Sequence, residues 1–89
     1  MTKNDLIEIV ARKAHLTKKA AGEAVETFIN EVQRALIKGE KVILSGFGTF
    51  DVDQRKGKIM HLRGKPETVS PYRIPRFRPG KRLKRVIKK

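Results

Sequence analysis

One amphipathic helix, longer than the rest of the chain can cover, constrains the fold more than any other feature of this sequence. Apolar residues recur at intervals of three and four between Lys18 and Lys38, after a candidate N-cap at Thr17 and before a glycine stop at Gly39. At 1.5 Å per residue such a helix is about 30 Å long. The segment before it predicts only a short helix that begins after Thr2. A second copy of the chain is therefore the expected cover for the apolar face.

A chain of 89 residues without cysteine has few other means of stabilisation. Small domains draw on disulfides, metals or partner subunits, and the cysteine count excludes a disulfide framework and a thiolate metal site. The two histidines, His15 and His61, lack the spacing of metal ligands. No run approaches the roughly 20 apolar residues of a membrane span, and no signal-peptide pattern opens the chain. We expect a cytoplasmic homodimer with no metal, no cofactor and no membrane partner.

From residue 41 onward the apolar period changes from that of a helix to that of a strand. Residues 41–45 predict a strand, Gly46 to Gly48 a turn, and residues 50–53 and 73–78 alternate apolar and charged side chains. The basic stretch between them predicts a protruding hairpin at about 53–73, in which Gly64 supplies the positive φ of the turn. Residues 81–88 predict a short basic helix.

These elements predict an α+β fold within a single domain, residues 1–89. Residues 1–45 form its mainly helical dimerisation part, and residues 46–89 contain the antiparallel sheet, the β-arm and the C-terminal helix. The four phenylalanines are expected in the core, whereas the sequence leaves the place of Tyr72 open, with the edge of the sheet as one option. The predicted dimer core combines apolar side chains of the long helix and the sheet: Phe28, Ile29, Val32, Leu36, Leu44, Phe47, Phe50 and Phe77.

Charge is distributed unevenly along the chain. Residues 1–45 carry eight basic and six acidic side chains, whereas residues 46–89 carry fourteen basic and three acidic ones. A net charge of +11 on one half repels itself unless a polyanion neutralises it, and this asymmetry is typical of nucleic-acid binding. A membrane surface would favour a more strongly amphipathic basic helix. An RNA-binding or ribosome-associated protein is the main alternative to a DNA-binding one.

Catalysis has no support in the sequence. No Ser/His/Asp set, cysteine nucleophile or carboxylate pair forms a recognisable site, and the phosphate loop G-x-x-x-x-G-K-[ST] is absent. The Gly46-Phe47-Gly48 turn matches half of a dinucleotide fingerprint, but it links two strands and opens no helix. We therefore expect a protein that is not an enzyme and has no small-molecule substrate.

The order of these elements resembles the bacterial HU/integration host factor family of histone-like architectural DNA-binding proteins. The resemblance rests on residues 3–7 (KNDLI), 39–42 (GEKV), 46–50 (GFGTF) and 74–81 (IPRFRPGK), and it covers nearly the whole chain. It implies an intertwined dimer with a helical base, saddle-like antiparallel sheets and two protruding β-arms. It also implies a nucleoid-associated protein that binds double-stranded DNA through the minor groove and bends or compacts it. The expected preference for bent, nicked or junction DNA exceeds any preference for sequence.

The arm tip departs from the family pattern. The family arm carries a basic-Asn-Pro-x-Thr-Gly tip whose proline wedges between base pairs, and this chain has no Asn-Pro. Leu62 is our candidate for the wedge, with Met60 and Pro66 as alternatives, because Leu, Met and Pro all serve as wedges in DNA-kinking proteins. A tip that only follows the groove, or contacts a neighbouring protein on DNA, remains the other interpretation.

The predicted DNA contacts share a basic or polar side chain on the arm or the adjoining body. Lys3 and Lys81 match basic residues that lie on the DNA-facing side in the family. The full set is Lys3, Arg55, Lys56, Lys58, His61, Arg63, Lys65, Arg73, Arg76, Arg78, Lys81, Lys84 and Arg85.

Overall fold

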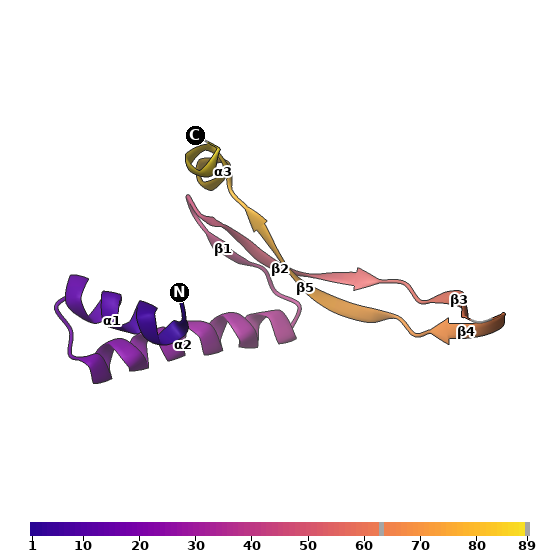
Figure 1. Cartoon of the computed structure of the whole chain (residues 1–89), viewed down its shortest axis with the longest axis horizontal. Coiled ribbons are helices and arrows are strands. Elements are labelled where there is room, and N and C mark those ends of the chain that lie inside the picture. Colours follow the sequence, from indigo (N-terminus) through magenta and orange to yellow (C-terminus); the bar gives the residue numbers. More distant parts are fainter. Residues whose placement is uncertain (63, 89) are drawn as a thin grey trace. The chain divides into compact units, whose positions relative to one another are not determined.

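The computed structural model describes residues 1–62 and 64–88, with side chains at residues 1–57, 64 and 70–88. Three helices and five strands follow one another as α1 (Lys3–Lys13), α2 (Lys18–Ile37), β1 (Val42–Leu44), β2 (Gly48–Arg55), β3 (Lys58–Leu62), β4 (Lys65–Val69), β5 (Tyr72–Pro79) and α3 (Lys81–Ile87) (Figure 1). The chain divides into two compact units, Met1–Arg34 and Ala35–Lys89. The predicted α+β class is confirmed.

The first unit is a pair of helices with well-defined ends. Thr2 caps α1: its hydroxyl accepts from the Asp5 amide at 3.2 Å, and the Asp5 carboxylate accepts from the Thr2 amide at 2.9 Å, so two otherwise unpaired donors are satisfied together. His15 then adopts a left-handed φ of 57°, and the Leu16 amide donates back to the Ala11 carbonyl. Ala14 is thus the C-cap residue of α1, and His15 is the left-handed residue that ends the helix.

Helix α2 starts and ends close to the predicted residues. The Thr17 hydroxyl accepts from the Ala20 amide at 3.1 Å, and Gly39 has a φ of 81° beyond the last turn. The Gly39 and Glu40 amides donate to the carbonyls of Leu36 and Ala35. Together these bonds form a Schellman motif, which requires the left-handed conformation that glycine adopts without strain.

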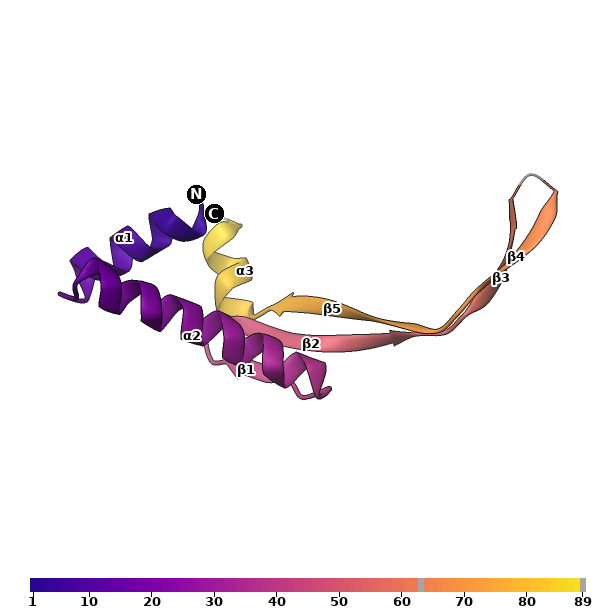
Figure 2. The same ribbon diagram turned by 90° about the horizontal axis from the view of Figure 1, so that it is seen from below.

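In the second unit, β1, β2 and β5 form an antiparallel sheet with β2 in the centre. The turn from β1 to β2 closes with a bond from the Phe47 amide to the Leu44 carbonyl, and Gly46 within it has a φ of 81°. Strands β2 and β5 pair over their full length, from Gly48 opposite Pro79 to Arg55 opposite Tyr72. Figures 1 and 2 show these two strands side by side, and the hairpin then continues into β3 and β4.

The outer hairpin keeps the register of the inner one. Lys58 lies opposite Val69, so two residues on each side separate this pair from Arg55 and Tyr72. The pairing ends with Leu62 opposite Lys65, and Gly64, next to Lys65, has a φ of 77°. The predicted arm and its positive-φ glycine are confirmed, but the arm is not one continuous ladder: its pairing is interrupted where Lys56 and Gly57 face Ser70 and Pro71, and a proline has no amide to donate.

Apolar burial within the chain is slight. In the part of the chain that the structure describes, Ala21 is the one apolar residue that is buried completely. Phe28 of α2 remains 51% exposed, and Phe47 and Phe77 of the second unit remain 46% and 37% exposed. Because large aromatic side chains normally supply much of a core, neither unit has a complete core of its own.

Candidate nucleic-acid interface

Pairing of β1, β2 and β5 sorts the side chains of the sheet onto two faces. Residues directly opposite each other in an antiparallel pair project to the same face, and successive residues alternate. What we call the apolar face comprises Val42, Leu44, Gly48, Phe50, Val52, Gln54, Arg73, Pro75, Phe77 and Pro79. What we call the polar face comprises Ile43, Thr49, Asp51, Asp53, Arg55, Tyr72, Ile74, Arg76 and Arg78.

Three phenylalanines meet on the apolar side of the second unit. The Phe77 ring lies 4.9 Å from the Phe50 ring and 5.3 Å from the Phe47 ring, centre to centre, in tilted arrangements. Gly48 makes this approach possible, because a Cβ there would lie 2.5 Å from the Phe77 ring. Phe47, Phe50 and Phe77 thus form one aromatic cluster. The exposed parts of the Phe47 and Phe77 rings are free to pack against a further apolar surface.

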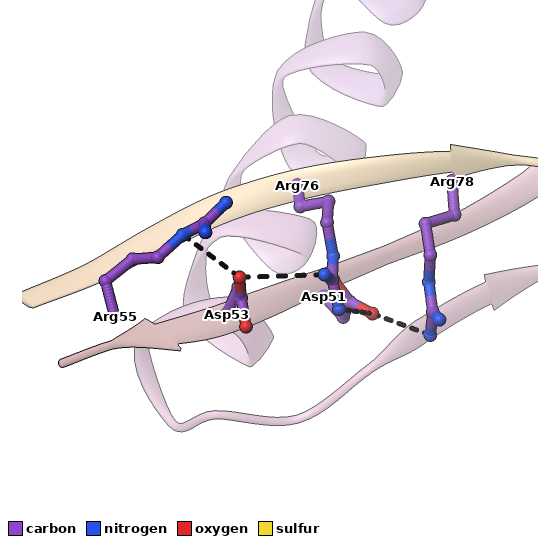
Figure 3. A network of polar contacts seen from close by, with 5 residues as sticks. All are labelled: Asp51, Asp53, Arg55, Arg76 and Arg78. Atoms are coloured by element: carbon purple, nitrogen blue, oxygen red, sulfur yellow. Dashed lines mark hydrogen bonds and ion pairs between the residues drawn. The ribbon is translucent and has the colours of Figure 1, made fainter.

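A network of ion pairs occupies the centre of the polar face (Figure 3). Nε of Arg76 donates to Oδ1 of Asp51 at 2.8 Å, and Nη2 donates to Oδ2 at 3.2 Å, so the guanidinium binds the carboxylate through two parallel bonds. Nη2 of Arg78 lies 2.8 Å from Oδ2 of the same carboxylate. Asp51 is only 3% exposed, whereas the two arginine side chains are 42% and 53% exposed. The guanidiniums therefore cover the carboxylate and themselves remain at the surface.

The same contacts set the protonation of Asp51. The hydrogen bond from Arg76 holds the pKa of Asp51 below its ordinary value; burial acts in the opposite direction, and the positive charges of Arg76, Arg78 and Lys41 lower the pKa further. The pKa of Arg76 is raised, first by its hydrogen bond to Asp51 and also by the charges of Asp51 and Asp53. Both groups are thus charged near neutral pH.

Several predicted DNA contacts have partners within the chain. Nε of Arg55 lies 3.2 Å from Oδ2 of Asp53, which is also 3.7 Å from Nη1 of Arg76. The two terminal nitrogens of Arg73 donate to the Ile37 carbonyl, each at 3.2 Å, and so satisfy a free carbonyl at the C-terminal end of α2. In the first unit, Lys3 forms an ion pair with Glu26.

Other predicted contacts are exposed and carry no ion pair among the side chains that the structure describes. They are Lys56 at the end of β2 and Lys81, Lys84 and Arg85 on α3. The side chains of Lys58, His61 and Lys65, and the wedge candidates Met60, Leu62 and Pro66, lie outside the described side chains, and Arg63 lies outside the described residues altogether. The backbone register places Met60 opposite Glu67, and His61 opposite Pro66.

The paired arginines show what the sequence analysis missed. It assigned Asp51 and Asp53 simply to a polar face, although Asp51 is buried beneath two arginines. A hairpin centred beside Gly64 places residue 51 opposite residue 76, so the predicted turn already contained the signal. The contact from Arg73 to the end of α2 had no such signal, because it joins residues 36 positions apart outside any strand pairing.

The described part of the chain contains no helix that is long and apolar enough to cross a membrane. Among those same residues, no three side chains of the His, Cys, Asp or Glu type gather as metal ligands would. The geometry that remains is a basic surface on the polar face, on α3 and along the base of the arm.

Comparisons with known proteins match this architecture along its whole length. The model of a family described as bacterial DNA-binding protein matches residues 1–88. The chain is 45% identical to DNA-binding protein HU of Staphylococcus aureus over 91 aligned positions, covering 99% of this chain and 100% of that protein. It is 43% identical to DNA-binding protein HU of Thermotoga maritima, with the same coverage. In a cocrystal structure of Anabaena HU with DNA, the HU chain superimposes with a TM-score of 0.89 at 30% identity, covering 98% of this chain and 97% of that one. A chain that shares sequence, element order and fold with these proteins over nearly every residue belongs to the HU family of bacterial DNA-binding proteins.

Proposed function

We propose that this protein is a homodimeric architectural protein that binds double-stranded DNA with little sequence preference and bends or compacts it. The dimer is a single intertwined domain in which the apolar side of α2 and the apolar face of the sheet are covered by the second copy. The arms follow the minor groove. The protein acts without catalysis, in the bacterial cytoplasm, as part of the nucleoid.

The observation that carries the proposal is the pairing of a basic, exposed polar face with an apolar face that lacks a complete cover. Arginines gather on the polar face. The cluster of Phe47, Phe50 and Phe77 lies on the side of the apolar face. The superposition on the HU chain of the Anabaena cocrystal with DNA supports the same assignment. A hollow lined by Pro79, Leu83 and Ile87 beside α3 offers further apolar surface to a partner.

The elements that carry the predicted contacts favour recognition of DNA by its shape rather than by its base sequence. The predicted DNA contacts of the second unit lie on or beside strands and on the short α3, not on a long helix. Arginine and lysine beside strands suit the negative potential of a narrow minor groove. Affinity then depends on phosphate contacts, and six to ten such contacts give a log–log salt slope of about −5 to −9.

A competition assay tests the proposal. The protein is mixed at one salt concentration with a labelled intact duplex, and nicked duplex, four-way junction and structured RNA compete in turn. Nicked and junction DNA are expected to compete best, because they bend at the lowest energetic cost. Stronger competition by structured RNA would overturn the proposal in favour of an RNA-binding or ribosome-associated protein.

A further inference from the structure

The buried carboxylate of Asp51 lies beneath the surface on which we place DNA. Both of its oxygens are engaged: Oδ1 accepts from Arg76, and Oδ2 contacts Arg76 and Arg78. Figure 3 shows the two arginine side chains reaching it from β5, while Asp51 itself belongs to β2. A carboxylate that is 3% exposed does not present its charge directly to a ligand on this face.

The guanidiniums that cover Asp51 retain binding capacity. Each guanidinium carries five N–H donors; Asp51 accepts two hydrogen bonds from Arg76 and forms an ion pair with Arg78. Their partial exposure leaves the remaining donors near solvent. The three groups together carry a net charge of +1, so the cluster still attracts an anion.

We propose that Asp51 is a positioning residue, which holds Arg76 and Arg78 as one preformed site for a DNA backbone phosphate on the polar face. This inference rests on the proposed function and names a site within it. The physical reason is preorganisation: a free arginine loses rotamer freedom when it binds a phosphate, whereas an anchored arginine has lost that freedom already. Two hydrogen bonds to Asp51 fix Arg76, and an ion pair to the same carboxylate holds Arg78.

Two effects of Asp51 on DNA affinity oppose each other, which makes the inference testable. The negative charge repels the phosphate backbone, so its removal by itself would tighten binding. The carboxylate also anchors two arginine side chains. Its removal frees them, and this effect by itself would weaken DNA binding. The proposal states that the anchoring effect is the larger one.

The test compares Asp51→Asn with Glu40→Gln in binding a labelled duplex of about 25 base pairs across a salt series. Both substitutions remove one negative charge, but the Glu40 side chain takes part in none of the ion pairs described above. Freeing one to two side chains predicts about fivefold weaker binding for Asp51→Asn. Glu40→Gln is expected to bind as well as the wild type or slightly better. Binding by Asp51→Asn that equals or exceeds wild-type binding overturns the proposal.

A second background separates positioning from a general effect on folding. When Arg76 and Arg78 are both replaced by Lys, the charges remain but the forked contact to the carboxylate is lost. Adding Asp51→Asn to this background should no longer weaken binding, and should tighten it slightly. A further fivefold loss there would show that Asp51 does not act through the two arginines.

Folding is checked for each variant by thermal unfolding and sedimentation. If Asp51→Asn does not fold, Arg76→Lys is compared with Arg12→Lys, a charge-preserving change at an exposed arginine of α1 outside the predicted DNA contacts. Arg76→Lys should weaken binding several-fold, whereas Arg12→Lys should change it less than twofold; equal affinities overturn the proposal. Failure of the wild type to bind DNA would instead refute the proposed function itself.

Discussion

At the scale of single residues, the exposed lysines of α3 differ from the arginines of the sheet, because the arginines have partners within the chain. Lys81 has no ion pair within the described side chains, so replacing it removes a charge and leaves no buried partner behind. Lys81→Ala should weaken binding to a similar degree on all duplex sequences and reduce the salt slope by about one. Lys19→Ala, an exposed lysine on α2, is the matched control. Unchanged affinity and slope would remove Lys81 from the interface.

Gly48 shows how one residue without a side chain permits the aromatic cluster. A Cβ at this position would lie 2.5 Å from Phe77 and 2.7 Å from the Arg78 carbonyl oxygen, so Gly48→Ala must displace the ring or the strand. We expect a loss of about 1–3 kcal/mol in the free energy of unfolding, measured by urea denaturation.

Gly22→Ala provides the opposite case within α2. The added Cβ would lie 4.0 Å from Ile7, an ordinary contact, and alanine favours the helix. The free energy of unfolding of this variant should be up to about 1 kcal/mol higher than that of the wild type. Equal effects of the two substitutions would contradict the packing described for Gly48.

The lowered pKa of Asp51 predicts how stability changes with pH. Because the folded-state pKa lies below the unfolded-state value of about 3.9, the unfolded chain binds the proton more tightly. The contribution of Asp51 is therefore complete well above pH 4 or so and is lost as the pH falls through the lowered value. Urea denaturation should show Asp51→Asn less stable than wild type at neutral pH, with a difference that narrows in acid. A difference that stays constant would contradict this assignment.

At the scale of elements, the β-arm combines a regular register with an unusual tip. Leu62 closes the turn opposite Lys65, and Met60 and Pro66 lie within one to two pairs of it. If one of the three inserts between base steps, replacing all three by Ala should increase the end-to-end distance of a labelled duplex in the complex. The change in affinity should be smaller than the change in bending, because the few kcal/mol needed to unstack a base step are no longer spent when the wedge is removed.

Leu16→Ala serves as the control for the arm variant. Leu16 is an apolar side chain that is 42% exposed between α1 and α2, outside the arm and the polar face. An end-to-end distance that matches the wild-type complex in the triple variant would leave an arm that follows the groove without kinking DNA.

At the scale of the whole molecule, the incomplete cores of the two units predict an obligate dimer. Sedimentation at micromolar concentration should give twice the chain mass. Phe47 is 46% exposed within the chain and touches Phe77, so full burial in the dimer predicts a loss of about 3–5 kcal/mol for Phe47→Ala. A stably folded wild-type monomer would contradict the dimer.

Local chemistry determined much of this protein from sequence alone. Caps at Thr2 and Thr17, glycines at 39 and 64, and alternating strands located the three helices, the turns and the hairpin within a few residues, because capping and positive φ depend on neighbouring residues only. The interruption of the arm beside Gly57 and Pro71 was visible only as scattered breakers in a long basic stretch.

Tertiary structure decided which of the described basic residues have a partner within the chain. The sequence presented Arg55, Arg73, Arg76 and Arg78 as equivalent candidates for DNA contact, but strand register and chain reversal gave each of them a partner within the chain. Pairing between residues 25 positions apart depends on how two strands align, and a guanidinium binds whichever carboxylate or carbonyl that alignment brings within reach. Charge composition therefore indicated the class of partner, while the fold determined which basic side chains are anchored by a partner within the chain.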